Sequence, residues 1–122
     1  MRGGRTYVIA EAGVNHGGDV AVAARLVDAA ADAGADAVKF QTFRADDLVT
    51  RDAPAAAYQR ANVGATRQHE MLAALELDDA AHESLAARAA ERGIEFLSTP
   101  FDLGSLGMLC LLYTSPSPRD VE

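Results

Sequence analysis

The fold is decided by Gly34-Ala-Asp-Ala-Val-Lys-Phe-Gln41, where a glycine that ends a helix is followed at once by a short strand. Residues 20–33 place their apolar side chains on one helical face, and glycine is the residue expected just past a helix end. The apolar run Tyr7–Ala10 precedes that helix and is typical of a buried strand. Two strands joined by one helix within about 35 residues form a βαβ unit, whose strands are parallel. The sequence therefore predicts a parallel α/β sheet.

The same order continues along the chain. Asp78 or Asp79 is expected to cap a further helix, and Gly93 to end it. His69 and His82 fall in polar helical stretches and are predicted at the surface. The remaining expected elements are a long loop at 42–62, a short helix at 66–75, a strand at 94–97, a loop at 98–102 and the start of a helix at 103–109.

Alternating strands and helices are typical of a barrel or of a doubly wound sheet. The loop at residues 11–18 lacks the glycine pattern of a dinucleotide site. A (β/α)8 barrel takes roughly 250 residues, so three strands make less than half of one. Such a piece leaves open sheet edges and exposed apolar faces, and we expect low stability.

The last residues depart from this order. The string Cys110-Leu-Leu-Tyr-Thr-Ser-Pro-Ser-Pro-Arg-Asp120 contains two Ser-Pro steps, which end helices. It resembles the translation of a sequencing adapter; the alternative is a natural Ser/Pro linker. We therefore predict a partial barrel at 1–109 and a non-native tail at 110–122.

Composition excludes several classes of protein. The 122 residues are 49% hydrophobic and 24% charged with a net charge of −7, as in soluble globular proteins. The sequence has no stripe of basic residues of the kind that binds nucleic acid, so we expect no nucleic-acid partner. The single cysteine, Cys110, rules out a disulfide framework within one chain and suits a reducing cytoplasm. Without a leader or an apolar run near 18 residues, we expect no membrane association and a cytoplasmic location.

The second strand carries the first candidate residues for chemistry. Alternation places Lys39 and Gln41 on one face and Val38 and Phe40 on the other. In a barrel the apolar pair would meet the helices, and the polar pair would point inward. An inward lysine near the carboxyl end of a strand, where barrel active sites lie, either binds an anionic substrate or pairs with a carboxylate such as Glu11.

Further candidates follow the first and third strands. Glu11 could move a proton or bind a sugar hydroxyl, or could serve only as counter-ion to Lys39. Asn15 and His16 lie on the glycine-rich loop, where a lone histidine is more often structural than catalytic and lacks a second metal ligand. Ser98 and Thr99 stand between a strand and a helix start, which suits a phosphate, although a simple Ser/Thr turn explains them locally.

Three blocks together resemble a known family. Val8-Ile-Ala-Glu-Ala-Gly-Val-Asn-His-Gly-Gly-Asp19, Gly34-Ala-Asp-Ala-Val-Lys-Phe-Gln-Thr42 and Gly93-Ile-Glu-Phe-Leu-Ser-Thr-Pro-Phe-Asp102 are similar to the N-terminal barrel of the N-acetylneuraminate synthases, which include the bacterial sialic, legionaminic and pseudaminic acid synthases. The similarity covers about residues 7 to 109. It implies the first portion of a TIM (β/α)8 barrel with parallel strands, truncated.

The resemblance also implies a reaction and its partners. The family condenses phosphoenolpyruvate with an N-acyl amino sugar of the mannosamine type and releases phosphate. It works as a homodimer with Mn2+ or Mg2+, held by histidines from later strands, so no metal ligand is assigned to this chain. A further lysine and the main catalytic glutamate also come from beyond Leu109. We therefore expect this chain alone to be inactive.

Roles for individual residues follow from the resemblance only. It implies that Lys39 and Thr99 bind phosphoenolpyruvate, with Ser98 as a weaker candidate. It places Glu11, as a catalytic candidate within this chain, and Gln41 opposite the sugar or the reacting C2 centre. Asn15 and His16 would shape that wall of the site.

Two other functions remain open. The chain could be a short natural module that binds an anion without catalysis. It could also come from another phosphoenolpyruvate-dependent synthase of ulosonic acids, although the blocks around residues 11–16 and 98–101 fit the sialic branch better.

Overall fold

A computed structural model of the chain describes residues 5–48 and 59–114. Residues 49–58 of the expected loop and 115–122 of the expected tail lie outside this part. The elements, in order, are β1 (Ile9–Gly13), α1 (Val20–Asp32), β2 (Ala37–Thr42), α2 (Ala45–Leu48), α3 (Gln59–Leu75), α4 (Asp79–Glu91), β3 (Glu95–Pro100) and α5 (Leu103–Thr114).

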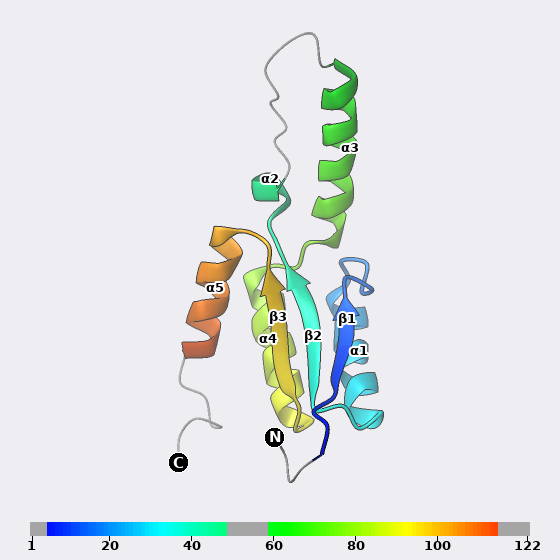
Figure 1. The fold of residues 1–122 in the computed structure, drawn as a ribbon, viewed down its shortest axis with the longest axis vertical. Coiled ribbons are helices and arrows are strands. Elements are labelled where there is room, and N and C mark those ends of the chain that lie inside the picture. The colour runs from blue at the N-terminus through cyan, green and yellow to red at the C-terminus, as the bar shows by residue number, and fades with distance from the viewer. Residues whose placement is uncertain (1–4, 49–58, 115–122) are drawn as a thin grey trace.

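The strands form one parallel sheet in the order β1-β2-β3, which confirms the predicted parallel α/β arrangement (Figure 1). Helices α1 and α4 lie behind the sheet in Figure 1, α5 flanks β3, and α3 rises beyond the carboxyl ends of the strands. None of the described helices covers the front of the sheet. None of the helices in the described ranges is long and apolar enough to cross a bilayer.

The ends of α1 and α4 form where the sequence predicts them. Asp19 accepts a hydrogen bond from the N–H of Ala21 at the start of α1, and Asp78 caps α4 in the same way. Gly34 and Gly93 follow α1 and α4 with φ of +84° and +73°, a backbone region that glycine enters without strain. These stops let each helix turn directly into the next strand.

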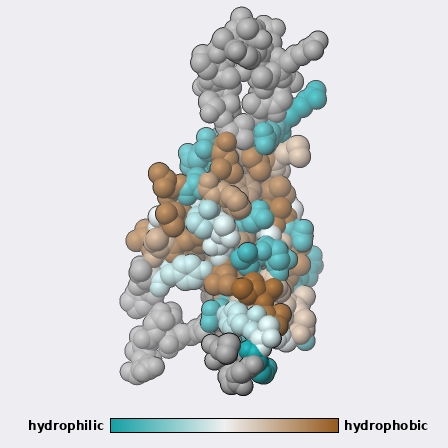
Figure 2. All heavy atoms as spheres, in the orientation of Figure 1, coloured by the Kyte–Doolittle hydropathy of each residue, from teal (hydrophilic) through white to brown (hydrophobic). Residues whose placement is uncertain are grey.

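The hydrophobic core lies between the sheet and helices α1 and α4. Val38 and Phe40 of β2 are fully buried on this side, as the alternation predicts, together with Val27 of α1 and Leu85 of α4. The other side of the sheet leaves apolar surface in solvent: Ile9 is 47% exposed. Figure 2 shows this side, with hydrophobic residues gathered over the lower sheet and over α5.

An ionic cluster joins α1 to α4 on the surface. Arg88 donates to both carboxylate oxygens of Asp28, at 2.9 and 2.6 Å, and Arg92 donates to Asp28 and to Asp32. The hydrogen bonds from Arg88, joined by those from Arg92, lower the pKa of Asp28 to about 2. The cluster therefore favours a charged Asp28 across the physiological range.

Several predicted boundaries differ from the structure. The first strand lies at Ile9–Gly13 rather than at Tyr7–Ala10, because Gly13 still pairs with Phe40. Helix α3 begins at Gln59, within the region expected as loop. Helix α5 continues past Leu109 to Thr114, where the hydroxyl of Tyr113 donates to the Phe96 carbonyl. The division of the chain at residues 109 and 110 stays a prediction.

The expectation that His69 and His82 lie at the surface is wrong. They are only 2% and 1% exposed. His69 contacts Asp46 of α2, and His82 contacts Thr42 of β2. Each histidine turns inward because a polar partner from another element satisfies its ring nitrogen there.

Candidate functional site

The open face of the sheet brings together polar side chains from all three strands. Glu11 pairs with Lys39 across β1 and β2, and Gln41 pairs with Thr99 across β2 and β3. Paired residues of neighbouring strands share a face, and Lys39 and Gln41 share one by alternation. Four of the predicted residues therefore meet near the carboxyl end of the parallel sheet, where α/β proteins place their ligands.

Lys39 forms an ion pair with Glu11. The distance from Lys39 Nζ to Glu11 Oε2 is 3.2 Å, and the side chains remain 39% and 52% exposed. An ion pair this open contributes about 0–1 kcal/mol, because water competes with it. Lys39 is also the only lysine among the 122 residues. The structure thus shows the pairing with a carboxylate that the sequence left open for Lys39, and the ammonium group stays partly accessible to solvent on this face.

A β-bulge at Ala12 makes room for this cluster. The pairing steps from Glu11–Lys39 to Gly13–Phe40, which leaves Ala12 without a partner in the register. Gly13 has φ +55°, and a Cβ there would lie 3.3 Å from Glu11 Oε1 and 3.7 Å from Gln41 Nε2. A Cβ at this position would therefore crowd the Glu11 carboxylate, whereas its contact with Gln41 would be ordinary. Bulges often re-aim side chains beside functional sites.

Ser98 lies on the other side of the sheet from Lys39. Strand β3 continues to Pro100, so the expectation of a loop from Ser98 is wrong. Ser98 pairs with Phe40, and its hydroxyl lies 2.5 Å from that of Thr42. Only Thr99 of this pair of candidates reaches the face that carries Lys39.

His16 is likewise separated from Lys39. It is 2% exposed, and its ring centroid lies 6.1 Å from that of Phe40, a core residue. Its Nδ1 accepts the Gly18 N–H at 2.8 Å, and Nε2 has no partner among the described residues. Burial, followed by the neighbouring His82, lowers the pKa of His16. The geometry thus favours a neutral, structural histidine.

The loop that carries His16 is held firmly in place. Asn15 is exposed on this loop, and its N–H donates to the Ala12 carbonyl. A Cβ on Gly18 would lie 1.9 Å from the carbonyl oxygen of Ala74, at the end of α3. Only a glycine allows the loop and α3 to approach so closely.

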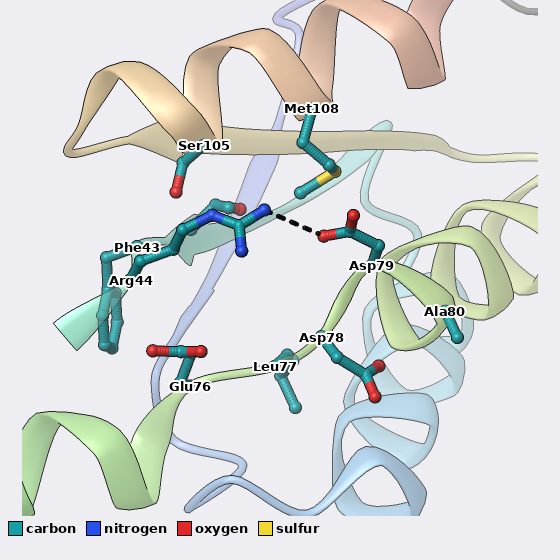
Figure 3. Close-up of a pocket in the computed structure, with 10 residues that line it drawn as sticks. Phe43, Arg44, Glu76, Leu77, Asp78, Asp79, Ala80, Ser105 and Met108 are labelled. Atoms are coloured by element: carbon teal, nitrogen blue, oxygen red, sulfur yellow. Dashed lines mark hydrogen bonds and ion pairs between the residues drawn. The ribbon is translucent and has the colours of Figure 1, made fainter. Parts of the chain in front are cut away.

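A cavity of about 360 Å³ lies beside the strand ends, on the helix side. Figure 3 shows Arg44 reaching across it to Asp79, an ion pair of 3.4 Å. Other polar groups around it have partners: Glu76 accepts the Ala45 N–H, and Ser105 donates to Asp102. The predicted site residues do not line it. We interpret this cavity as a packing gap where α4, α5 and the segment after β2 meet, and not as a substrate site.

No metal site can be assigned to this part of the chain. Across residues 5–48 and 59–114, no three His, Cys, Asp or Glu side chains converge as metal ligands would. The candidate site therefore consists of one ammonium group, one carboxylate, one amide and one hydroxyl, all on an open face.

Thr42, the last residue of β2, and His82, which contacts it from behind the sheet, were not anticipated at the site. Thr42 Oγ1 lies 2.7 Å from His82 Nε2, across 40 residues of sequence. The available signal was the position of His82 four residues after the capping Asp78, which brings its ring back to the Asp78 carbonyl.

Comparison with known proteins agrees with the predicted family. The NeuB family matches residues 26–115. The chain is 51% identical over 107 residues to the N,N'-diacetyllegionaminic acid synthase of Legionella pneumophila, covering 87% of this chain and 30% of that protein. It is 47% identical over 106 residues to the enzyme of the same name from Campylobacter jejuni, covering 86% and 32%.

A solved structure extends the agreement to the fold. The N-acetylneuraminic acid synthetase of Leptospira borgpetersenii, in complex with citrate, superposes with a TM-score of 0.73 and 31% identity, over 89% of this chain and 34% of that one. The predicted fold class is thereby confirmed. The chain spans about a third of the length of the relatives that it matches. With the family match over most of its length, this chain belongs to the NeuB family.

Proposed function

We propose that Glu11, Lys39, Gln41 and Thr99 form the first part of the substrate site of a synthase that joins phosphoenolpyruvate to an N-acyl amino sugar of the mannosamine type. The observation that carries this proposal is the convergence of Lys39 and Glu11, 3.2 Å apart, with Gln41 and Thr99 on one face of the sheet. The names of the most similar relatives support the same class of product, a nonulosonic acid.

The reaction makes specific demands on these groups. C3 of phosphoenolpyruvate attacks the aldehyde carbon of the open sugar, and the aldehyde oxygen becomes a hydroxyl group. A water oxygen adds at C2, and the bond from C2 to the bridging oxygen breaks to release phosphate. The site must therefore hold a multiply charged anion and manage protons beside it.

The chain's own residues meet part of these demands. The Lys39 ammonium would bind the anion of phosphoenolpyruvate, with the Thr99 hydroxyl donating to it. Glu11 would hold a sugar hydroxyl or take a proton near C2, and Gln41 would donate its amide to the same centre. A divalent metal, Mn2+ or Mg2+, would supply Lewis-acid chemistry in the complete enzyme, but the described side chains do not fit it.

We also propose that these residues need further chain to turn over substrate. The candidate site is open on one side, and Lys39 is 39% exposed. Catalysis of this type benefits from a site that excludes water. Incubation of the chain with phosphoenolpyruvate, N-acetylmannosamine and Mn2+ should release no phosphate above background, and clear turnover would contradict this part of the proposal.

Binding of phosphoenolpyruvate tests the site directly. Because Lys39 is the only lysine, an amine-reactive label can modify only Lys39 and the N-terminal amine. Phosphoenolpyruvate should slow labelling of Lys39 and leave the N-terminal amine unchanged. Lys39→Met should abolish the binding seen by NMR titration, whereas Arg25→Met, which removes an exposed cation from α1, should keep it. Equal protection of both amines, or full binding by Lys39→Met, would refute the proposal.

A second candidate function is an anion-binding module without chemistry. The openness of the Lys39–Glu11 pair favours it for the isolated chain. Titrations with phosphoenolpyruvate and with inorganic sulfate separate the two functions. A simple anion module should bind both, whereas the substrate site of a synthase should bind phosphoenolpyruvate and not sulfate.

A further inference from the structure

A network of buried and half-buried hydrogen bonds lies behind the candidate site, on the helix side of the sheet. Ser98 Oγ lies 2.5 Å from Thr42 Oγ1, which lies 2.7 Å from His82 Nε2. The other ring nitrogen of His82 donates to the Asp78 carbonyl at 2.8 Å. His82 is 1% exposed and Thr42 3% exposed. These hydrogen bonds thus tie β3, β2 and the start of α4 together inside the protein.

For a neutral His82 ring, the chemistry of the partners fixes the direction of these bonds. A carbonyl can only accept, so His82 Nδ1 carries a proton. In the neutral ring Nε2 is then an acceptor, and the hydroxyl of Thr42 must donate to it. Thr42 Oγ1 in turn accepts the proton of the Ser98 hydroxyl. One arrangement of protons therefore satisfies all three side chains.

The two hydroxyl residues are sequence neighbours of candidate site residues. Thr42 follows Gln41, and Ser98 precedes Thr99. Gln41 and Thr99 are paired in register on the open face, whereas Thr42 and Ser98 point to the helix side. A bond between Thr42 and Ser98 behind the sheet therefore reinforces the backbone pairing of β2 and β3 at the point where Gln41 and Thr99 stand in front.

His82 is itself held in a fixed orientation. Its ring packs edge-on against Phe96, with centroids 6.3 Å apart, and Phe96 stacks on Phe40 at 5.7 Å. The Asp78 carbonyl holds Nδ1 from the first turn of α4. The acceptor Nε2 is therefore presented to Thr42 from a rigid support.

We propose that His82 is a positioning residue for the substrate site. Acting through Thr42 and Ser98, it fixes the separation of the strand ends and so aims Gln41 and Thr99 at the anion, without touching substrate itself. The inference rests on the proposed function for its ligand, but the positioning of Gln41 and Thr99 is a property of the unliganded chain and can be measured without any ligand.

Two amide variants of His82 test the proposal. A glutamine places its oxygen near the position of Nε2 and can still accept from Thr42, whereas an asparagine is shorter and reaches only towards Asp78. His82→Asn should weaken binding of phosphoenolpyruvate on the order of tenfold, the effect of one lost buried hydrogen bond. His82→Gln should stay close to the wild type. His69→Gln, at an equally buried histidine of α3, serves as the control and should not change binding.

NMR spectra of the full chain supply the readout that does not depend on a ligand. In the wild type, the 15N shifts of His82 should show a protonated Nδ1 and an unprotonated Nε2. The Gln41 side-chain amide and the Thr99 backbone amide should shift in His82→Asn and not in His69→Gln. Thr42→Val and Thr42→Ser test the same hydrogen bond from the side of Thr42. Only Thr42→Val, which removes the hydroxyl, should shift the Gln41 and Thr99 signals. This second pair of variants provides the test if His82→Asn fails to fold.

The outcomes separate the two proposals. If wild-type chain does not bind phosphoenolpyruvate but the Gln41 and Thr99 signals shift as expected, the proposed function fails and the positioning role stands. A protonated Nε2, unchanged Gln41 and Thr99 signals in both His82→Asn and Thr42→Val, or equal effects of glutamine and asparagine would overturn the positioning role.

Discussion

Gly18→Ala measures how firmly the β1–α1 loop is held against the end of α3. Gly18 and Gly34 both have φ of +84°, so an alanine at either position meets the same left-handed backbone. That conformation costs about 1–2 kcal/mol for a residue with a Cβ. The two glycines differ in their surroundings. A Cβ at Gly18 would lie 1.9 Å from the Ala74 carbonyl oxygen, whereas one at Gly34 meets nothing within 4 Å.

The difference in stability follows from that contact. Ordinary contact begins near 3.4 Å, so the loop or the end of α3 must move apart from 1.9 Å. Overpacking of this kind costs about 1–3 kcal/mol beyond the backbone penalty. We expect Gly18→Ala to lower the free energy of unfolding by about 2–5 kcal/mol and Gly34→Ala by about 1–2 kcal/mol.

Urea unfolding followed by far-ultraviolet circular dichroism gives both values, with Gly34→Ala as the matched control. The amide signals of Ala74 and Leu75 should shift in Gly18→Ala only. Equal losses of stability in the two variants would refute the reasoning, because they would show that the loop does not contact α3 as closely as the structure places it.

Three further measurements test other parts of the molecule. Leu85→Ala removes a fully buried side chain of α4 and should cost about 2–5 kcal/mol in urea unfolding, whereas Met71→Ala, at a position 68% exposed, should change stability by less than about 0.5 kcal/mol. The pKa of Asp28 is lowered to about 2 in the folded chain, so its stabilising effect is complete above the ordinary value of 3.8 and is lost as the pH falls through about 2. Asp28→Asn should therefore remove part of the pH dependence of unfolding in that window, and an unchanged profile would contradict the cluster with Arg88. Because burial lowers the pKa of His16, its ring proton signals should titrate below the ordinary histidine value of 6.5, and titration at or above that value would show that the ring is not buried.

Local patterns were enough to predict the sheet and the ends of α1 and α4. The period-two alternation in β2 placed Val38 and Phe40 on the helix side and Lys39 on the other, as the structure has them. Asp19 and Gly34 marked the two ends of α1. Such signals depend on neighbours in sequence, and the physical causes act over the same short range.

The errors arose where distant residues decide the outcome. His82 is buried because Thr42 meets its ring from 40 residues away, and His69 because Asp46 does so from 23 residues away. The polar neighbours of both histidines gave no sign of these partners. Ser98 was grouped with Thr99 as a loop residue, but pairing with β2 continues to Pro100 and turns the two side chains to opposite faces. Only the register between strands separates them.

The strand order has a consequence for how the chain is made. β2 and β3 each pair with the strand synthesised just before them, so each meets a partner that has already been made. Synthesis proceeds at about 5–20 residues per second, whereas helices and turns form within microseconds. The sheet can therefore grow one strand at a time as the chain leaves the ribosome, with α1 and α4 covering its back as each is completed. The front of the sheet, which no described helix covers, is then the surface that a nascent chain would expose.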